Sequence, residues 1–448
     1  MGRSFVHRLS AHTPLHNTHF DRYTARTRRS KNRDLFRDAR GTLLRQAVEG
    51  WWRRAFYFLL KIIFHNSPLE KKVDQKELRS ILIIPYGDAI GDLIAASPLW
   101  RVIKRRVSDC KIGVLTSDRN ESLLRADPDV DVQYKFAGRR DIKNWGSLRI
   151  ARKEGYQIVL NLHFTHQTDY GFFANYLSPK AIKITGAHPR RDLYSIFFNL
   201  IGHRERHTTS LPQLSTELLS EAVEFEPALH LSEAWPSIVI PDDAQRAVDG
   251  AIGSVSDFII IHQQAATPFR EWGIPNSIEL AKLLVNRYPS FSVFLTASPA
   301  MQESLKEAVR GANDSRIRVY PSSKDLLQFA AFIQRARLVI SPETAVPHIA
   351  SATRTPVLVL LPDGEKLPVE WLPVGTPSRL LAPHVRGAAV KTIPVSEVWG
   401  ASISLLDGSW NMSQTSLNVG GLQHPMFQRP NGNKLLQEFA SDLLSSHE

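Results

Sequence analysis

Short apolar runs alternate with stretches of helical spacing along most of the chain after residue 80. The first five runs have four to six residues each and lie at 81–84, 111–115, 131–136, 157–162 and 181–185. Stretches of helical spacing lie near 90–106, 118–125, 142–153 and 168–177. Because strands that alternate with helices at this spacing are typical of βαβ units, this series predicts a parallel sheet covered by helices.

A second series of the same kind follows a helical stretch, LPQLSTELLSEAVEF, and a proline-bearing link, EAWPSIVIPDD. Its apolar runs are 258–262, 291–296, 317–320, 337–341 and 356–361. Its helical stretches lie near 276–287, 299–310, 323–335 and 344–353. The two series predict two doubly wound α/β domains with a cleft between the carboxyl ends of their strands, where ligands of such folds bind.

We therefore expect four parts in the chain. An N-terminal arm would cover residues 1–78, and the two sheet domains would cover 79–235 and 236–400. A tail at 401–448, rich in Ser, Gly and Asn, would include a helix near 433–445.

The most hydrophobic stretch of the arm is WWRRAFYFLLKIIF, at residues 51–64. As a helix it would be about 21 Å long, which is too short for a hydrocarbon core of roughly 30 Å. A narrow cationic face beside a wide aromatic and aliphatic one is typical of a helix that lies in a membrane interface. The same pattern fits a helix packed on the protein with a solvated basic edge. We expect the helix to span about 46–66.

The net charge of +12 is concentrated in the same arm. Residues 1–80 hold 18 Lys+Arg and 7 Asp+Glu, which leaves 38 and 37 for the rest of the chain. The arm is therefore the part that attracts anions, and no nucleic-acid partner is expected. One cysteine, Cys110, excludes an intrachain disulfide and any cysteine-based metal centre. The first fifty residues contain no apolar stretch of the secretory kind.

Four turns at predicted strand ends carry groups suited to chemistry. They are GDAIGD (87–92), HQQAATPFREW (262–272), SPAMQE (298–303) and SPETAVPH (341–348). Glycines let the first turn approach a ligand closely, and Asp92 would lie where a helix begins, which stabilises a carboxylate. An ordinary N-cap aspartate is the alternative. The fourth turn leads into a helix N-terminus, whose free N–H groups suit a diphosphate.

Five stretches in this order resemble glycosyltransferase family 9, the ADP-heptose:lipopolysaccharide heptosyltransferases of GT-B fold. They are ILIIPYGDAIGDLIAASPLWRVIKRR, YQIVLNLHFTHQTDYGFFANYLSPKAIKITG, RERHTTSLPQLSTELLSEAV, IHQQAATPFREWG and VISPETAVPHIASATRTPVLVLL. The resemblance runs from about residue 80 to about residue 400. It implies two Rossmann-like domains with parallel sheets and a cleft between them.

The resemblance also implies an inverting, metal-independent sugar transfer that needs no cofactor. Asp92 matches the family's catalytic aspartate, which takes the proton of the acceptor hydroxyl as that oxygen attacks the anomeric carbon. The donor, most simply ADP-heptose, would bind the second domain, where Arg270 and the amides of Thr344 and Ala345 would meet its diphosphate. The other positions matched to the donor are Gln264, Ala265, Ala266, Thr267, Met301, Glu303, Glu343 and His348.

Several of these positions depart from the family pattern, and they bear on which donor is used. The usual Asp-Thr-Gly is replaced by Glu343-Thr344-Ala345, whose added Cβ hinders close approach to a phosphate. Ala265 and Ala266 stand where the family has hydroxyl side chains. Met301 stands where the family often has Glu, although Glu303 follows two residues later.

On the acceptor side the resemblance assigns Gly91 and a basic cluster in the first domain. The cluster consists of His163, His166, Arg190, Arg204 and Arg206. It suits an anionic lipid-linked saccharide such as phosphorylated lipid A–Kdo, and each member fits a solvated basic loop equally well.

The resulting expectation is a transferase that is peripheral on the cytoplasmic face of a bacterial inner membrane and held there by its arm. A same-fold enzyme with another nucleotide-sugar or a protein acceptor is one alternative. A catalytically silent, membrane-associated binding protein is the other, and binding of RNA by residues 1–45 ranks third.

Overall fold

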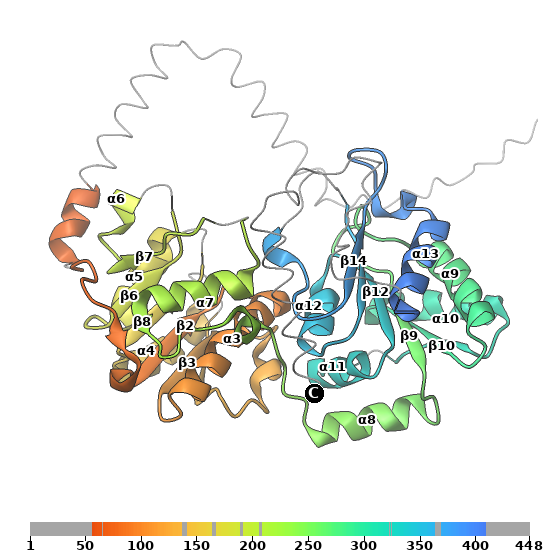
Figure 1. Ribbon diagram of the computed structural model, residues 1–448, viewed down its shortest axis with the longest axis horizontal. Helices are drawn as coiled ribbons and strands as arrows, with labels where there is room; N and C mark the ends of the chain where they lie inside the picture. The colour runs from red at the N-terminus through yellow and green to blue at the C-terminus, as the bar shows by residue number, and fades with distance from the viewer. Residues whose placement is uncertain are drawn as a thin grey trace, which may run out of the picture. The chain divides into compact units, whose positions relative to one another are not determined.

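The computed structural model describes residues 56–64, 66–136, 141–163, 167–188, 191–205, 208–321, 323, 325–362 and 369–408 (Figure 1). The chain forms two compact units, residues 1–64 and 65–448. Both sheets belong to the second unit. The arm before residue 56 and the predicted helix near 433–445 lie outside the described residues.

The first sheet has six parallel strands in the order β4-β3-β2-β5-β6-β7. Their bounds are β2 Ser80–Ile84, β3 Lys111–Thr116, β4 Val132–Lys135, β5 Ile158–Asn161, β6 Ile182–Thr185 and β7 Leu200–Ile201. The helices along this part of the chain are α3 Ile90–Arg106, α4 Trp145–Glu154, α5 Gln167–Leu177, α6 Arg191–Tyr194 and α7 Leu211–Ala222. A short parallel pair, β1 Val73–Asp74 and β8 Val223–Glu224, lies apart from this sheet.

The second sheet also has six parallel strands, in the order β11-β10-β9-β12-β13-β14. They are β9 Phe258–His262, β10 Ser292–Thr296, β11 Ile317–Val319, β12 Leu338–Pro342, β13 Val357–Leu360 and β14 Ser378–Leu381. Its helices are α8 Asp242–Ile252, α9 Ile274–Arg287, α10 Gln302–Ala312, α11 Leu326–Gln334, α12 Ala345–Ala352 and α13 Val395–Leu406.

Helices cover both faces of the second sheet, which explains why its strands are apolar throughout. One hydrophobic cluster joins α9, α10 and α13 to one face, and another joins α8, α11 and α12 to the opposite face. The second cluster continues into α3 and α7 of the first sheet, so the two sheets share a core. Within the first sheet, the run Ile81–Ile84 of β2 is at most 2% exposed.

The order of strands creates a switch point in each sheet. In the first sheet, β3 and β4 lie on one side of β2, whereas β5, β6 and β7 lie on its other side. In the second sheet, β10 and β11 lie on one side of β9, and β12, β13 and β14 lie on its other side. All strands of a sheet are parallel, so their carboxyl ends share one edge, and ligands of such sheets bind where the strand order reverses. The predicted turns 87–92 and 341–348 follow β2 and β12, beside these two points.

Most predicted elements are confirmed, and one predicted helix is wrong. The stretch near 118–125 forms only a 3-10 turn, Glu121–Leu124. Its preceding residue, Asn120, accepts the N–H of Ser117 and donates to two carbonyls of the turn after β2. The side chain thereby fixes a bend where a helix would have to begin. The helices α8 and α13 and the strand β14 were not predicted, and α13 runs past residue 400, where the second domain was expected to end.

The link between the sheets is fastened to α3. Ser237 donates its N–H to Ser97 Oγ at 2.9 Å and accepts from Arg101 Nε at 2.9 Å. One turn further along α3, Arg106 pairs with Glu233 at 2.8 Å. The helix α3 also begins at the turn after β2. The same helix therefore anchors the link between the sheets and positions the first candidate site.

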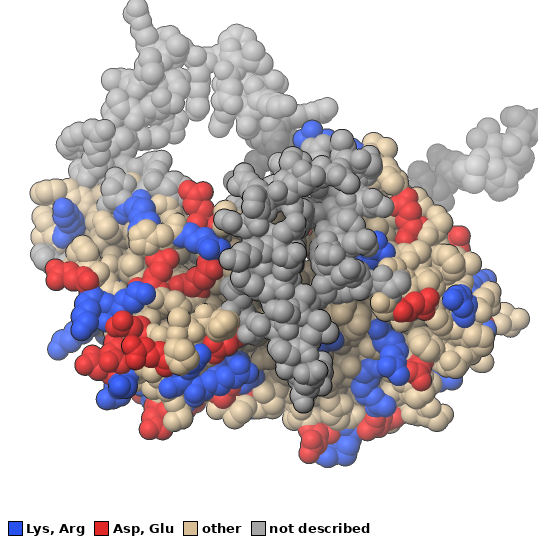
Figure 2. Space-filling view, in the orientation of Figure 1, with Lys and Arg blue, Asp and Glu red and all other residues tan. Residues whose placement is uncertain are grey.

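The described part of the N-terminal unit contains a helix over residues 56–63. Its exposed large apolar side chains are Phe56, Phe58, Leu59, Ile62 and Ile63. No helix in the described residues is both long and apolar enough to span a bilayer. On the rest of the chain, Figure 2 shows Lys and Arg side chains interspersed with Asp and Glu on the face in view, which agrees with the near-balance of charge after residue 80.

Candidate functional site

The turn after β2 places Asp92 at the third position of α3. The helix begins at Ile90, so its N-cap is Ala89; Asp92 lies in the first turn, as expected, and the alternative that Asp92 is an ordinary N-cap is wrong. Asp92 Oδ2 instead accepts a hydrogen bond from the N–H of Ala89 at 3.2 Å. Gly87 packs against the same oxygen, and a Cβ at position 87 would overlap it. Asp92 is therefore held against the backbone of its own turn.

The loop after β3 supports the same turn from the side. Ser117 Oγ donates to the carbonyl of Asp88 at 3.0 Å. Asn120 Nδ2 donates to the carbonyls of Asp88 and Ala89 at 3.2 and 3.3 Å. These bonds fix the peptide groups of the turn, so the carboxylates of Asp88 and Asp92 project from a rigid support.

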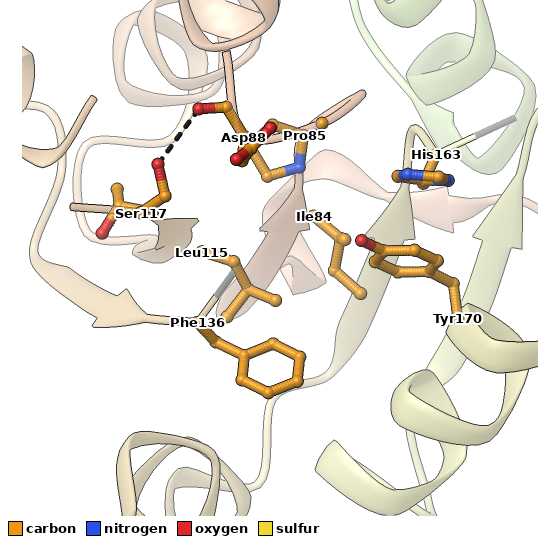
Figure 3. Close-up of a pocket in the computed structure, with 10 residues that line it drawn as sticks. Ile84, Pro85, Asp88, Leu115, Ser117, Phe136, His163 and Tyr170 are labelled. Atoms are coloured by element: carbon orange, nitrogen blue, oxygen red, sulfur yellow. Dashed lines mark hydrogen bonds between the residues drawn. The ribbon is translucent and has the colours of Figure 1, made fainter. Parts of the chain in front are cut away.

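A pocket of about 150 Å³ opens at this edge of the first sheet (Figure 3). Its polar side is formed by Asp88 and Ser117, and its opposite side by the rings of His163 and Tyr170. Apolar side chains at the strand ends also line the pocket, and they are Ile84, Leu115 and Phe136. The remaining lining residues are Pro85, Gly87 and Thr116. The pocket lies beside the β2–β5 switch point, since Asp88 follows β2 and His163 follows β5.

The two rings on one side of this pocket are stacked. His163 and Tyr170 have ring centroids 3.9 Å apart and planes inclined by 16°. Burial raises the pKa of Tyr170 to about 12, and the negative charges of Asp88, Asp169 and Asp92 act in the same direction. The phenol is therefore a protonated hydroxyl at neutral pH, with acidic groups around it.

At the second switch point, the predicted donor residues Arg270 and Glu343 form an ion pair. Arg270 Nη1 lies 3.5 Å from Glu343 Oε2, and both side chains are partly exposed. Thr344 is the N-cap of α12, and its Oγ1 accepts the N–H of Val346 at 3.2 Å. Ala345 opens the helix. A cation and a helix N-terminus thus follow one another along this edge, which favours binding of an anion.

His348, on the first turn of α12, contacts the first turn of α3. A Cβ at Gly91 would lie 2.7 Å from His348 Cδ2, so only glycine permits this approach. On its other side the imidazole meets the edge of Trp371, with centroids 5.8 Å apart. Burial lowers the pKa of His348 to about 4, so the ring is neutral at pH 7. The contact brings the helix of Asp92 and the helix of Thr344 together at their N-termini.

The remaining predicted donor residues lie in the turn after β9 and in the segment after β10. Gln264 Oε1 accepts the N–H of Ser298 at 2.8 Å and so ties the turn after β9 to the turn after β10. Met301 packs against the core, and Glu303 pairs with Lys306 at 2.8 Å, which lowers the pKa of the Glu303 carboxyl. In the segment between Gln264 and Arg270, Ala265 is half-buried, whereas Ala266 and Thr267 are exposed.

The predicted acceptor cluster is only partly brought together. His163 lines the pocket, and Gly91 lies against His348. Arg204 points its Nε at Glu217 Oε2, 2.7 Å away, so its charge is already paired. His166, Arg190 and Arg206 lie outside the described residues.

Several residues near the carboxyl edges of the two sheets were not predicted from the sequence. Asp88 was not predicted as a site residue, whereas Asp92 was. The two residues belong to similar Gly-Asp pairs, which differ in their distance from the start of the helix. Tyr170 and Phe136 look like core positions in a helix and a strand. His262, at the end of β9, bonds Thr296 Oγ1 at 2.9 Å, and burial lowers its pKa to about 4. Across the described ranges, no group of three or more His, Cys, Asp or Glu is arranged as a metal site.

Two comparisons of sequence identify similar proteins. The family model "Glycosyltransferase family 9 (heptosyltransferase)" matches residues 174–378. The chain is 26% identical to lipopolysaccharide heptosyltransferase 3 of Escherichia coli K12 over 303 residues, which cover 63% of this chain and 82% of that protein.

Comparison of structures likewise identifies glycosyltransferases of this kind. The family 9 glycosyltransferase of Veillonella parvula superposes with a TM-score of 0.62 at 16% identity, covering 75% of this chain and 99% of the other. ADP-heptose LPS heptosyltransferase II of E. coli gives a TM-score of 0.58 at 17% identity, with 74% and 99% covered. At these identities the likeness concerns the fold, and it confirms the expected pair of parallel-sheet domains of the GT-B type.

Proposed function

Because this chain is a glycosyltransferase, a heptosyltransferase-like protein of family 9, we propose that it moves a heptose from ADP-heptose to a saccharide of the lipopolysaccharide inner core. The transfer would invert the anomeric carbon and need neither a metal nor a cofactor. The sugar donor and acceptor named for the E. coli heptosyltransferases motivate this choice.

The observation that carries the proposal is the contact between the first turns of α3 and α12. Gly91 and His348 touch at this point, one residue from Asp92 and four residues from Thr344. A carboxylate and a helix N-terminus therefore lie at one place in the molecule. Sugar transfer from a nucleotide diphosphate uses this combination, since it needs a base for the acceptor and positive potential for the leaving group.

In the proposed reaction, a carboxylate oxygen of Asp92 takes the proton from an acceptor hydroxyl. The acceptor oxygen forms a bond to the anomeric carbon while the bond from that carbon to the diphosphate oxygen breaks, and ADP leaves with the electron pair. The hydrogen bond from Ala89 to Asp92 Oδ2 orients the carboxylate for this step.

The leaving diphosphate would be stabilised by Arg270 and by the N–H groups that open α12. In the described residues Arg270 is paired with Glu343, at 3.5 Å and with partial exposure. Such a pair contributes about 1 kcal/mol or less, so a diphosphate with its greater charge would compete successfully for the guanidinium. Activity would then be unchanged by EDTA, since protein groups meet the charge.

The test combines cells and purified protein. A strain that lacks the protein should make lipooligosaccharide whose core is lighter by one heptose, as read by mass spectrometry. Purified protein should restore that heptose in vitro with ADP-heptose and the deficient lipooligosaccharide. An unchanged core in the deletion strain, together with no transfer in vitro, would reject the proposal.

A second candidate is a transferase of the same fold that uses another nucleotide-sugar. The pairing of Glu303 with Lys306, and the presence of Met301 and Ala345, favour it because these positions depart from the family's donor pattern. Thermal shift with a panel of nucleotide-sugars separates the two candidates, since a donor that binds the native state raises its melting temperature. A larger shift with a UDP-sugar than with ADP-heptose would favour the second candidate.

For location, we propose that the protein binds the inner face of the inner membrane through residues 46–66. The exposed side chains of the helix over 56–63 support this, with Phe58 and Ile63 exposed by 66% and 67%. Vesicles with anionic lipids should retain the full chain, and Phe58→Ser with Ile63→Ser should release it. Equal retention of both proteins would contradict this part of the proposal.

A further inference from the structure

Trp371 has a side chain whose contacts reach both sheets of the molecule. It ends the 3-10 turn Val369–Trp371, which lies between β13 and β14 of the second sheet. Its ring lies 5.8 Å from that of His348, with the planes at 77°, and 6.3 Å from that of Tyr86, with the planes at 72°. Both are the edge-to-face arrangements that aromatic pairs prefer. Of the ring pairs formed by described residues, the pair of Tyr86 and Trp371 is the one that joins the two sheets.

On the side of the first sheet, Tyr86 is fixed from two directions. Its hydroxyl donates to the carbonyl of Leu211, the first residue of α7, at 2.6 Å, and its ring packs on Trp371. Only 8% of Tyr86 is exposed. The next residue is Gly87, where a Cβ would overlap Asp92 Oδ2. Because packed side chains transmit displacements, a shift of the Tyr86 ring would move backbone that lies against the carboxylate.

On the side of the second sheet, Trp371 supports His348, and His348 packs on Gly91. The imidazole lies so close to α3 that a Cβ at Gly91 would be 2.7 Å from His348 Cδ2. Without the ring of Trp371 on its other side, the imidazole would have room to move away from Gly91. Since Gly91 directly precedes Asp92, the support given by Trp371 reaches the carboxylate by this second path as well.

Packing of a hydrophobic core is the alternative role for Trp371. The residue is partly buried against the larger hydrophobic cluster, which extends over both sheets. Trp399, on α13, is also partly buried, and it packs against the smaller cluster, whose buried members all lie between residues 259 and 405. The two tryptophans differ in that only Trp371 contacts the residues beside the turn of Asp92. Trp399 is therefore a matched control for the loss of a tryptophan from the second sheet domain.

We propose that Trp371 is a positioning residue for the sugar transfer, which acts through Tyr86 and His348 to hold Asp92 in place. The proposal rests on the proposed function for the role of Asp92, and it assigns to Trp371 no contact with the reacting atoms. Misplacement of a reacting group by about 1 Å can lower a rate by about 10²-fold. Loss of this support should therefore lower kcat and leave KM for donor and acceptor nearly unchanged.

The first test needs no transfer reaction. Hydrogen exchange, followed by mass spectrometry, is compared in the full-length wild type, Trp371→Leu and Trp399→Leu. Exchange reports local opening of the backbone, so Trp371→Leu should speed exchange of the peptide over 86–93 by about tenfold or more and leave that of β9 unchanged. Trp399→Leu should leave exchange over 86–93 at the wild-type rate. An unchanged rate over 86–93 in Trp371→Leu, or the same acceleration in both variants, would overturn the proposal.

The second test measures transfer. Trp371→Leu should lower kcat by about tenfold or more and change either KM by about twofold or less, because a displaced base affects the reaction step more than binding. Trp371→Phe keeps an aromatic ring and should lower kcat by only about two- to threefold. Trp399→Leu should retain the wild-type kcat. A raised KM with an unchanged kcat in Trp371→Leu, or an equal loss of kcat in Trp399→Leu, would contradict the assignment.

The two tests also separate this proposal from the proposed function. If Trp371→Leu does not fold, Trp371→Phe serves in both measurements, and wild-type exchange together with wild-type kcat in that variant would overturn the proposal. If the wild-type protein transfers no sugar at all, the proposed function fails. The exchange measurement then still decides whether Trp371 supports the turn of Asp92.

Discussion

The carboxyl edges of the two sheets have the same topology and opposite chemistry. The first edge is hollow, aromatic and acidic, with Asp88 and Asp92 beside the rings of His163 and Tyr170. The second edge carries a cation, Arg270, and the N-terminus of α12. In sheets of this kind the strand order sets where ligands bind, and in our proposal the turn residues decide what binds at each edge. In that proposal the acidic edge supplies the base for an acceptor hydroxyl, and the positive edge meets the diphosphate that leaves.

The largest effect should come from Asp92→Asn, which keeps the size of the side chain and removes its basicity. We expect kcat to fall by about 10²-fold or more, with little change in KM for the donor. Release of ADP in the presence of acceptor measures both quantities.

The control for this substitution is Asp109→Asn, which changes an exposed acid on the surface of the same sheet domain. Wild-type turnover is expected for the control. Turnover above one tenth of the wild-type value in Asp92→Asn would mean that the first edge does not supply the base.

The next effect should come from Gly91→Ala, which introduces a methyl group 2.7 Å from His348 Cδ2. Such overpacking costs about 1–3 kcal/mol, so the melting temperature should fall. Gly250→Ala is the matched control, because that helical position has no neighbour within 4 Å of the new Cβ, and alanine is favoured there by up to about 1 kcal/mol.

A double-mutant cycle sharpens this result. His348→Ala should recover most of the stability lost through Gly91→Ala, since it removes the clashing ring. If the two losses simply add, the helices do not touch at this point in solution.

A smaller effect should appear as a pH dependence of stability. The pKa of His348 is lowered to about 4 from its usual 6.5 by burial, so the unfolded state binds a proton more readily than the folded state. The stability contributed by the neutral ring is present above pH 6.5 and is lost as the pH falls towards 4. At pH 5 the loss amounts to about 1–2 kcal/mol relative to pH 7.

Urea unfolding at pH 7 and pH 5 measures this difference, with His348→Gln as the variant that should reduce it. His203→Gln serves as control because its imidazole is exposed and paired at the surface with Glu221. The prediction fails if His348→Gln and the wild type lose the same amount of stability over this interval.

The smallest effect should come from Glu343→Gln. Removing this carboxylate frees Arg270 from an ion pair worth about 1 kcal/mol or less, so donor affinity should rise by up to about fivefold. Isothermal titration with ADP measures it. Arg270→Gln should change affinity in the opposite direction, and a drop in ADP affinity in both variants would show that Glu343 assists the donor.

The sequence predicted the fold well because its signals are local. The run FIIIH predicts β9 with the bounds that the structure has, Phe258–His262. The helix near 90–106 is likewise confirmed as α3 Ile90–Arg106. The failure near residue 120 has a tertiary cause, since Asn120 bonds carbonyls of a turn that lies thirty residues away in sequence.

The candidate site was predicted less completely because it depends on distant contacts. Periodicity assigns Tyr170 to a helix and Phe136 to a strand, and it contains no sign that both line one pocket. The pairing of Arg204 with Glu217 was also beyond the sequence, because it requires the loop and α7 to be placed in space. Asp92 and His348 were named separately, and only the fold shows that their helices meet.

The contact between Gly91 and His348 has a consequence for how this protein can evolve. Two positions in separate halves of the chain share one small volume, so neither can be enlarged unless the other is reduced. Related sequences with alanine or serine at position 91 should therefore carry a residue smaller than histidine at position 348. Substitutions at positions 91 and 348 should therefore covary among related sequences. A change at both positions would indicate that the packing between the two halves of the chain has changed.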